Sequence, residues 1–212
     1  MMPAPQPEPG KASDLVSIWT VPAGCQGLIF DCDGTLVDSM PLHYQAWTTV
    51  LQRHALHLTE ARFYEWAGLP IDEIVSRLAR EQSIDVDASA VAAERDTCFH
   101  SMPASALHPV EAVVDIARRY HGQLPMAVAT GSTTASASAS LRAIGILEWF
   151  DAVISSHDAG RPKPAPDVFL LAAERINLAP SSCVAFEDGD AGLLAAQAAG
   201  MGTVDIRPWL PR

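Results

Sequence analysis

Lysine is nearly missing from this chain: Lys11 and Lys163 are the only two, and the other cationic side chains are arginines. In all, 14 Lys and Arg residues stand against 25 Asp and Glu residues, and the formal net charge is −11. Nucleic acids and anionic membranes are bound through basic side chains, so the composition argues against both as partners. An anionic substrate would need a local cation, which makes a divalent metal an expected component.

Cysteine is scarce, and long apolar runs are absent. Cys25, Cys32, Cys98 and Cys183 lack the spacing of zinc sites and are too few for a disulfide scaffold. This usage predicts a reducing compartment, which we take to be the cytoplasm. No apolar segment approaches the length of a membrane span. The proline-rich start lacks the basic and apolar regions of a signal peptide, so we expect a flexible tail over residues 1–21.

The pattern of apolar residues after position 105 predicts an α/β domain. The chain has 212 residues, 49% of them apolar, enough for one domain with an insertion or for two small domains. Short apolar runs alternate with helical stretches, which is typical of a Rossmann-like parallel sheet with helices on both faces. The expected strands are 28–30, 126–130, 150–155, 183–188 and 203–207, and the expected helices are 109–120, 132–145, 167–176 and about 190–200.

An insertion separates the first strand from the second. The interval from Asp33 to Thr130 is far longer than one crossover helix needs. Within residues 41–103 the apolar residues recur at helical spacing, and β-rich runs are absent. We therefore expect an all-helical cap domain at 41–103, able to close over a site on the core and exclude water. The core domain would then consist of 22–40 and 104–212.

The most informative stretch is DCDGTLVDS, residues 31–39, which directly follows the apolar run of the first strand. Asp31 and Asp33 emerge where a buried strand should end, and a glycine there allows a sharp turn. Loops at the carboxyl ends of strands surround the ligand crevice of an open α/β sheet. Asp-x-Asp alone is common in solvated turns, so the prediction of an active site depends on this position.

Three further clusters fall at strand ends or in the loops that follow. Thr130, Gly131 and Ser132 end the strand at 126–130, and Lys163 lies in the segment GRPKPAPD. Glu187 and Asp188 lie in FEDGDAG. Each cluster has a simpler interpretation, as a helix cap, a surface lysine or a solvated turn. If the strands are parallel, however, all the clusters meet at one edge of the sheet.

Gathered at one edge, four carboxylates would repel one another and take up protons unless cations offset their charge. Hard oxygen ligands favour Mg²⁺, and Lys163 would supply a second cation. With hydrogen bonds donated by Thr130 and by backbone N–H groups, the predicted arrangement is a cradle for a transferring phosphoryl group.

The four motifs, in this order, resemble those of the haloacid dehalogenase superfamily, and the similarity covers about residues 27–207. The helical insertion is similar to that of the β-phosphoglucomutase-like branch. Within that branch the chain looks most like bacterial phosphatases that act on fructose 1-phosphate or 6-phosphogluconate. The resemblance implies a Mg²⁺-dependent phosphatase that hydrolyses small sugar phosphates through an aspartyl-phosphate intermediate.

The same resemblance implies a role for each motif residue. Asp31 is the nucleophile, and Asp33 is the general acid and base. Asp31, the backbone carbonyl of Asp33, and Asp188 bind Mg²⁺, while Glu187 acts through water or from outside the ligand shell. The residues implied to bind phosphate or substrate are Thr130, Gly131, Lys163 and His43. His43 lies in the insertion, where a packed histidine is an equally good interpretation.

The enzyme classes within this superfamily differ in a few motif and cap residues, and these residues allow the classes to be compared with the present sequence. Dehalogenases lack the acid that is present here as Asp33, and phosphonatases need a cap lysine, which 41–103 does not contain. Mutases of this branch grip a second phosphate with a cap arginine, but the matching stretch, 68–73, carries Asp72 and Glu73 instead. A β-phosphoglucomutase-type mutase stays the alternative, since His43 and Trp47 match that group. The intact motifs disfavour a non-catalytic binding module, and the oligomeric state is not predicted.

Overall fold

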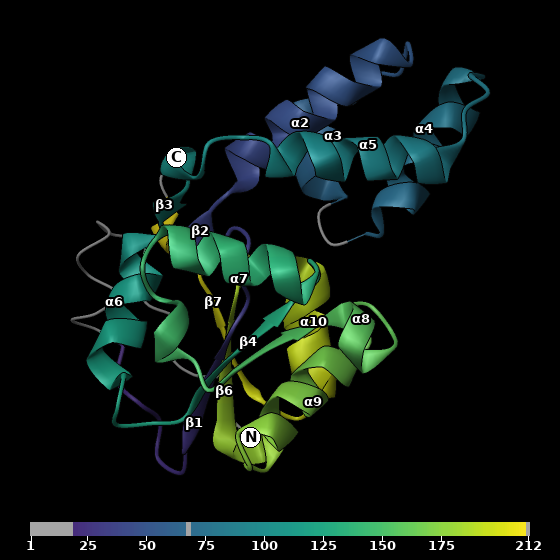
Figure 1. The fold of residues 1–212 in the computed structure, drawn as a ribbon. Coiled ribbons are helices and arrows are strands. Elements are labelled where there is room, and N and C mark those ends of the chain that lie inside the picture. Colours follow the sequence, from purple (N-terminus) through teal and green to yellow (C-terminus); the bar gives the residue numbers. More distant parts are fainter. Residues whose placement is uncertain (1–18, 67–68, 211–212) are drawn as a thin grey trace. The chain divides into compact units, whose positions relative to one another are not determined.

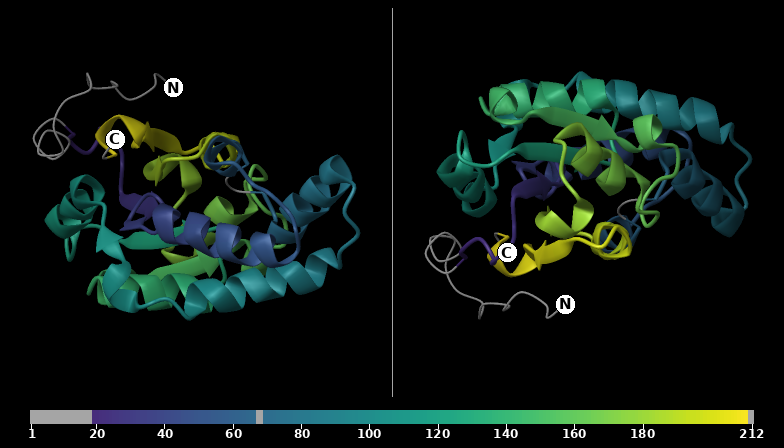
Figure 2. Two further views of the ribbon diagram at one scale, coloured as in Figure 1. Left: turned by 90° about the horizontal axis from the view of Figure 1, so that it is seen from above. Right: turned by 90° about the horizontal axis from the view of Figure 1, so that it is seen from below.

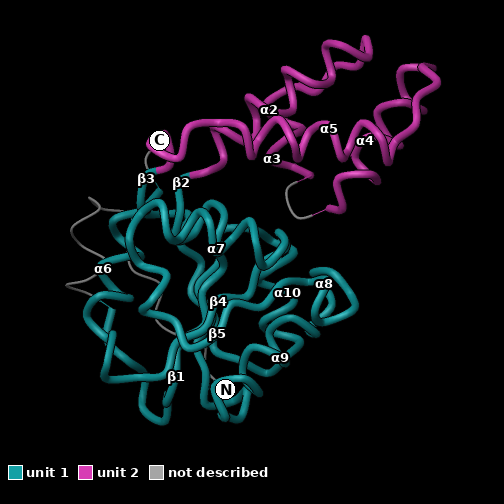
Figure 3. The backbone as a smooth tube through the Cα atoms, in the orientation of Figure 1, with its two compact units in different colours: residues 1–38, 108–212 teal, residues 39–107 magenta. Residues whose placement is uncertain are grey.

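The computed structural model describes residues 19–66 and 69–210. The chain divides into two compact units, which Figure 3 shows in different colours. Unit 1 combines Met1–Asp38 with His108–Arg212, and unit 2 is the intervening segment Ser39–Leu107. Within the described ranges, no helix combines the length and the apolar character needed to span a bilayer.

Unit 1 is built on a five-stranded parallel sheet (Figure 1). Its strand order is β5-β4-β1-β6-β7, so β1 occupies the centre, between β4 and β6. Leu28 of β1 is opposite Met126 of β4 on one side and Val184 of β6 on the other. The strands are β1 (Gly27–Phe30), β4 (Met126–Thr130), β5 (Ala152–Ser155), β6 (Cys183–Glu187) and β7 (Gly202–Asp205). Because all five are parallel, their carboxyl ends share one edge.

Helices cover both faces of this sheet (Figures 1 and 2). On one face, α9 and α10 pack against β-strand residues such as Ile29, Ala127 and Ala185 in one buried cluster. On the other face lie α6 and α7. The helices are α6 (Glu111–Tyr120), α7 (Thr134–Ala143), α8 (Ser156–Ala159), α9 (Asp167–Arg175) and α10 (Asp190–Ala198). Strands covered on both faces are apolar along most of their length, which explains the nearly continuous apolar runs in the sequence.

The predicted α/β fold class is confirmed, and the predicted strands and helices are present with small shifts at their ends. The helix expected from Ser132 begins at Thr134, because the Thr133 hydroxyl accepts the N–H of Ser136 and caps it. The strand expected from Phe150 begins at Ala152, and Asp151 instead accepts the N–H of Met126 through its side chain at 2.8 Å. A two-residue antiparallel pair, β2 (Val37–Asp38) with β3 (His108–Pro109), was not predicted.

Most of the predicted flexible tail, residues 1–21, lies outside the described residues. Its last part is described, and there Trp19 is buried, with 6% of its surface exposed. The indole ring meets Tyr120 and Phe186 edge-on, with ring centroids 5.7 and 5.0 Å apart. Apolar packing of this kind stabilises the start of the domain. Trp19 therefore belongs to the core of unit 1, in contrast to the expected tail.

Unit 2 is helical throughout its described residues. Its helices are α2 (Met40–Arg53), α3 (Glu60–Glu65), α4 (Ile71–Gln82) and α5 (Ala88–His100), followed by the short η1 (Ala104–Ala106). They surround a separate apolar core, which includes Trp47, Leu51, Phe63, Val75, Leu78 and Val91. The helical character agrees with the spacing of apolar residues in the sequence. The assignment of residues 41–103 as a cap domain stays a prediction.

Candidate active site

Asp31 is held at the carboxyl end of the central strand. Its backbone N–H donates to the carbonyl of Phe186 at 3.0 Å, so the β1–β6 pairing continues to the residue itself. The chain then turns back, since the N–H groups of Leu36 and Val37 both donate to the Cys32 carbonyl at 2.9 Å. The Asp31 side chain is consequently buried between neighbouring strand ends, with 7% of the residue exposed.

Gly34 allows this turn and the close approach of a second carboxylate. Its φ is +88°, a conformation that glycine adopts without strain. A Cβ at this position would lie 2.4 Å from Oδ2 of Asp188. The Thr35 hydroxyl donates to the other oxygen of that carboxylate, Oδ1, at 2.7 Å. The loop after Asp31 therefore positions Asp188, although the two segments are far apart in the sequence.

Lys163 joins three strand ends through its ammonium group. Nζ donates to Oδ1 of Asp31 at 2.6 Å, to Oε1 of Glu187 at 2.7 Å and to the Ala129 carbonyl at 3.0 Å. An ammonium has three N–H donors, so these bonds use all of them. The lysine and both carboxylates are buried. Such a geometry removes the interpretation of Lys163 as an ordinary surface lysine.

Glu187 fits beside Lys163 only because the first turn of the neighbouring helix, α10, contains a glycine. Its second oxygen, Oε2, accepts the N–H of Gly189 at 2.7 Å. A Cβ at Gly192, in the first turn of α10, would lie 1.6 Å from Oε1, which is a severe overlap. Gly192 was not among the predicted site residues. The sequence signal was a glycine inside a helix that is otherwise rich in alanine, where glycine is unfavourable.

Burial and like charges shift the ionisation of the acidic groups. Burial raises the pKa of Asp31 well above its usual range, and the ammonium of Lys163 opposes this shift only in part. Burial, followed by the charge of Glu187, raises the pKa of Asp188 to about 7. Burial alone would lower the pKa of Lys163, but the charges of Asp31 and Glu187 outweigh it and raise that pKa. The lysine is thus a permanent cation.

The same carboxylates suit a divalent cation. Asp31, Glu187 and Asp188 each offer a ligand oxygen, and these atoms all lie within 4.8 Å of one another. Burial is the main reason that the pKa of Asp188 is raised, and the charge of Glu187 adds to it, since one ammonium cannot balance three carboxylates. Hard oxygen donors of this kind match Mg²⁺. The residues present therefore fit the metal that the motifs imply.

The second predicted cluster reaches the same edge of the sheet. The Ser132 hydroxyl donates to Oδ2 of Asp33 at 2.6 Å, and its backbone N–H donates to the Thr130 hydroxyl at 3.0 Å. Thr130 is 1% exposed, and its carbonyl accepts the Ser156 hydroxyl at 3.3 Å. Gly131 is exposed, with open space where a side chain would be. The structure thus brings Thr130 and Asp33 together through Ser132.

His43, the remaining predicted site residue, lies on α2 in unit 2. It is buried and stacks on Phe99, with ring centroids 3.9 Å apart. The guanidinium of Arg95, on α5, contacts Nδ1 of the imidazole. These contacts describe a well-packed histidine, and its role in binding substrate stays a prediction.

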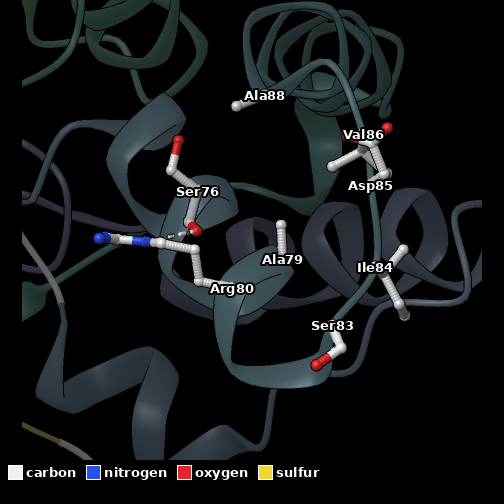
Figure 4. Close-up of a pocket in the computed structure, with 8 residues that line it drawn as sticks. All are labelled: Ser76, Ala79, Arg80, Ser83, Ile84, Asp85, Val86 and Ala88. Carbon is white, nitrogen blue, oxygen red and sulfur yellow. Dashed lines mark hydrogen bonds between the residues drawn. The ribbon is translucent and has the colours of Figure 1, made fainter.

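Unit 2 also carries a cavity of about 420 Å³ on its surface (Figure 4). It is lined by one side of α4 and by the residues that lead into α5, including Ser76, Arg80, Ile84 and Val86. Asp85 contributes its only carboxylate. The motif residues of unit 1 are not among the residues that line it. All of the residues that line the cavity belong to unit 2.

The comparisons with known proteins agree with this geometry. The family model for haloacid dehalogenase-like hydrolases matches residues 25–200. The chain therefore belongs to this family, and the predicted resemblance is confirmed.

Individual proteins of known name or structure are also similar to this chain. The chain is 41% identical to fructose-1-phosphate phosphatase YqaB of Escherichia coli over 181 residues, which cover 85% of this chain and 96% of that protein. It is 27% identical to β-phosphoglucomutase of Bacillus subtilis over 197 residues, covering 85% and 83% of the two chains. Among solved structures, that of CbbY from Rhodobacter sphaeroides in complex with phosphate matches with a TM-score of 0.75 at 24% identity, covering 84% of each chain.

Proposed function

We propose that this protein is a Mg²⁺-dependent phosphatase that hydrolyses small sugar phosphates through an aspartyl-phosphate intermediate on Asp31. The observation that carries the proposal is the buried ammonium of Lys163, which contacts Asp31 and Glu187 while Asp188 lies within reach of the same ion. The hydrolase family and the similarity to a sugar phosphatase support the class of reaction. A phosphorylated hexose such as fructose 1-phosphate is the first substrate to test.

In the first half of the reaction, a carboxylate oxygen of Asp31 attacks phosphorus. The bond from this oxygen to phosphorus forms, and the bond from phosphorus to the sugar oxygen breaks. Asp33 gives its proton to the departing sugar oxygen, because an alkoxide is a poor leaving group. Thr130 and the backbone of Gly131 donate hydrogen bonds to the phosphoryl oxygens, and the ammonium charge of Lys163 offsets the charge of these oxygens.

In the second half, water attacks the phosphorus of the aspartyl-phosphate. Asp33, now ionised, takes a proton from this water, and inorganic phosphate leaves as Asp31 is regenerated. Asp31, the backbone carbonyl of Asp33 and Asp188 would hold the Mg²⁺ ion, with Glu187 outside the ligand shell. When bound, the ion supplies charge that offsets the phosphoryl oxygens. Asp31 and Asp33 follow β1, Glu187 is the last residue of β6, and Asp188 follows it.

The alternative, a mutase of the β-phosphoglucomutase type, has less support. The identity to the mutase is 27%, against 41% to the phosphatase. A mutase must retain a sugar bisphosphate, and the stretch that would hold the second phosphate carries acids. Of these, Glu73 contacts Arg77 one turn later on α4, so the charge of that arginine is offset. Gly68, in the same stretch, lies outside the described residues.

A panel of metabolite phosphates tests the proposed function. With Mg²⁺ present, we expect phosphate release from fructose 1-phosphate and related hexose phosphates, measured as inorganic phosphate. β-Glucose 1-phosphate should give free phosphate and no glucose 6-phosphate. Formation of glucose 6-phosphate would instead establish the mutase, and no turnover of any phosphate ester would favour a binding module.

The raised pKa of Asp188 predicts that Mg²⁺ binding depends on pH. A carboxylate must lose its proton to bind the ion, and the pKa of Asp188 is about 7 without metal. We therefore expect the affinity for Mg²⁺ to fall about tenfold for each pH unit below 7 and to level off above it. Titration calorimetry at pH 6, 7 and 8 measures this dependence, and an affinity that does not change with pH would contradict the charge balance described above.

Thermal unfolding of the metal-free protein tests the same carboxyl group of Asp188. Here the expected pH dependence is the reverse, because stability falls as the pH rises whereas Mg²⁺ affinity increases. Folding raises the pKa of Asp188 from 3.8 to about 7, so the metal-free fold holds this proton more tightly than the unfolded chain does. This group therefore favours the metal-free fold at low pH, and its contribution declines as the pH rises from about 4 to 7. Mg²⁺ should restore stability at pH 8 more than at pH 6.

The proposal also includes a cap domain, a cellular location and a partner. We propose that residues 41–103 act as a cap over the active site, with His43, Trp47, Leu69 and Glu73 as candidates for substrate selection. The proposed location is the cytoplasm. All four cysteines lie in the described ranges and are free thiols, which is compatible with a reducing compartment. A small phosphorylated metabolite is the proposed partner.

A further inference from the structure

We propose that Ser132 is a positioning residue for the general acid Asp33, and that it determines which oxygen of that carboxyl group exchanges the proton. The inference rests on the proposed function, in which Asp33 protonates the leaving group. Ser132 has no role in the mechanism described above. Its contacts with two assigned residues are what distinguish it.

The side chain of Ser132 makes one short contact, to Asp33. Its hydroxyl oxygen lies 2.6 Å from Oδ2, at the short end of the range for a hydroxyl donating to a carboxylate. Both residues are half-buried. Partial removal from water strengthens the hydrogen bond and makes its loss more costly. The contact joins residues from different strand ends, so it is a tertiary contact and not a local turn.

The backbone of Ser132 is fixed independently of this contact. Its N–H donates to the Thr130 hydroxyl at 3.0 Å, and the Thr130 carbonyl in turn accepts the Ser156 hydroxyl. The neighbouring Thr133 caps α7. The hydroxyl of Ser132 is therefore presented to Asp33 from a rigid base, which is the arrangement that positions a catalytic group.

A hydroxyl donor makes the two oxygens of Asp33 unequal. When Ser132 donates to Oδ2, the proton of the neutral acid is favoured on Oδ1, because a carbonyl oxygen accepts a hydrogen bond better than a carboxyl hydroxyl oxygen does. Oδ1 then gives its proton to the sugar oxygen and later receives one from water. Without the hydroxyl, Oδ2 loses this donor, and the preference of the proton for Oδ1 is weakened. Removing the Ser132 hydroxyl should therefore slow the step in which Asp33 protonates the leaving group.

Two aryl phosphates separate this role from a general structural one. The 4-nitrophenolate of 4-nitrophenyl phosphate leaves without a proton, whereas the phenolate of phenyl phosphate is more basic and depends on the acid. Because kcat/KM includes every step through the first phosphoryl transfer, the ratio of kcat/KM for phenyl over 4-nitrophenyl phosphate reports on Asp33. Neither ester has a sugar that Ser132 could contact directly.

The experiment measures this ratio in the full-length protein with Mg²⁺. For Ser132→Ala we expect the ratio to fall about tenfold or more, and for Asp33→Asn further, within the range of about 100-fold to 10,000-fold that general acids contribute. Ser132→Thr, which keeps the hydroxyl, should restore most of the ratio. Ser138→Ala, a half-buried serine on α7, is the matched control and should leave it unchanged.

The outcomes distinguish the inference from the function on which it rests. A normal ratio in Ser132→Ala beside a lowered ratio in Asp33→Asn would overturn the role of Ser132 alone. An equal loss on both esters in Ser132→Ala, not restored by threonine, would also overturn it and indicate a structural role. A normal ratio in Asp33→Asn, or no hydrolysis of either ester by the unaltered protein, would overturn the proposed mechanism.

Discussion

Replacing Asp31 with asparagine should lower kcat for the best phosphosugar by about four orders of magnitude or more, because the amide cannot form the aspartyl-phosphate. The protein should nevertheless fold. Burial disfavours the charged form of Asp31, and an asparagine oxygen can still accept the hydrogen bond from Lys163. Phosphate release with saturating Mg²⁺, measured beside thermal unfolding, tests both statements.

Asp115→Asn is the matched control for this change. Asp115 lies on α6 and forms a surface ion pair with Arg118, so the same chemical substitution is made away from the strand ends. It should leave turnover unchanged. Asp31→Asn with turnover near that of Asp115→Asn would remove Asp31 as the nucleophile, whereas loss of folding in Asp31→Asn would show that its charge is required by the structure.

Replacing Lys163 with methionine should have the second largest effect, on stability as well as on turnover. The change leaves the buried carboxylates of Asp31 and Glu187 without the cation that contacts both. Removing one partner of a buried ion pair typically costs about 3–5 kcal/mol of unfolding free energy. The loss should be larger at pH 8 than at pH 5.5, since the two carboxyl groups can take up protons as the pH falls.

Arg161→Met provides the comparison within the same loop. Arg161 is also cationic and pairs with Asp167 at 2.9 Å, but 72% of its side chain is exposed. Solvent screens such a pair, so denaturant unfolding should show little change. A second variant, Lys163→Met with Glu187→Gln, should recover part of the stability lost in Lys163→Met, because one uncompensated charge is removed. Equal stabilities for Lys163→Met and Arg161→Met would contradict the account of the buried cluster.

The sequence allowed the sheet and most of the site to be predicted, and the reason is geometric. Continuous apolar runs marked strands buried on both faces, and parallel strands place their carboxyl ends at one edge. The proximity of Asp31 and Glu187, which lie far apart along the chain, follows from these two facts, and Lys163 contacts both from the loop after α8. The rarity of lysine made Lys163 stand out before its position was known.

Other features depend on contacts between segments that are far apart in the sequence, and no local sequence pattern predicts such contacts. The need for glycine at position 192 arises from the position of the Glu187 carboxylate, which only the packing of α10 against β6 determines. The hydrogen bond from Ser132 to Asp33 likewise depends on the tilt of two loops. Trp19 was assigned to a proline-rich tail by composition, yet its ring contacts Tyr120 and Phe186. Tertiary packing decided all three cases.

A rapid acid quench of the protein during turnover tests the central claim most directly. With Mg²⁺ and a phosphosugar labelled in its phosphoryl group, we expect the label on the peptide that contains Asp31, in an acyl phosphate that hydroxylamine releases. Asp31→Asn should carry no label under the same conditions. Label on another residue, or turnover by the unaltered protein with no labelled peptide at any quench time, would contradict transfer of the phosphoryl group to Asp31.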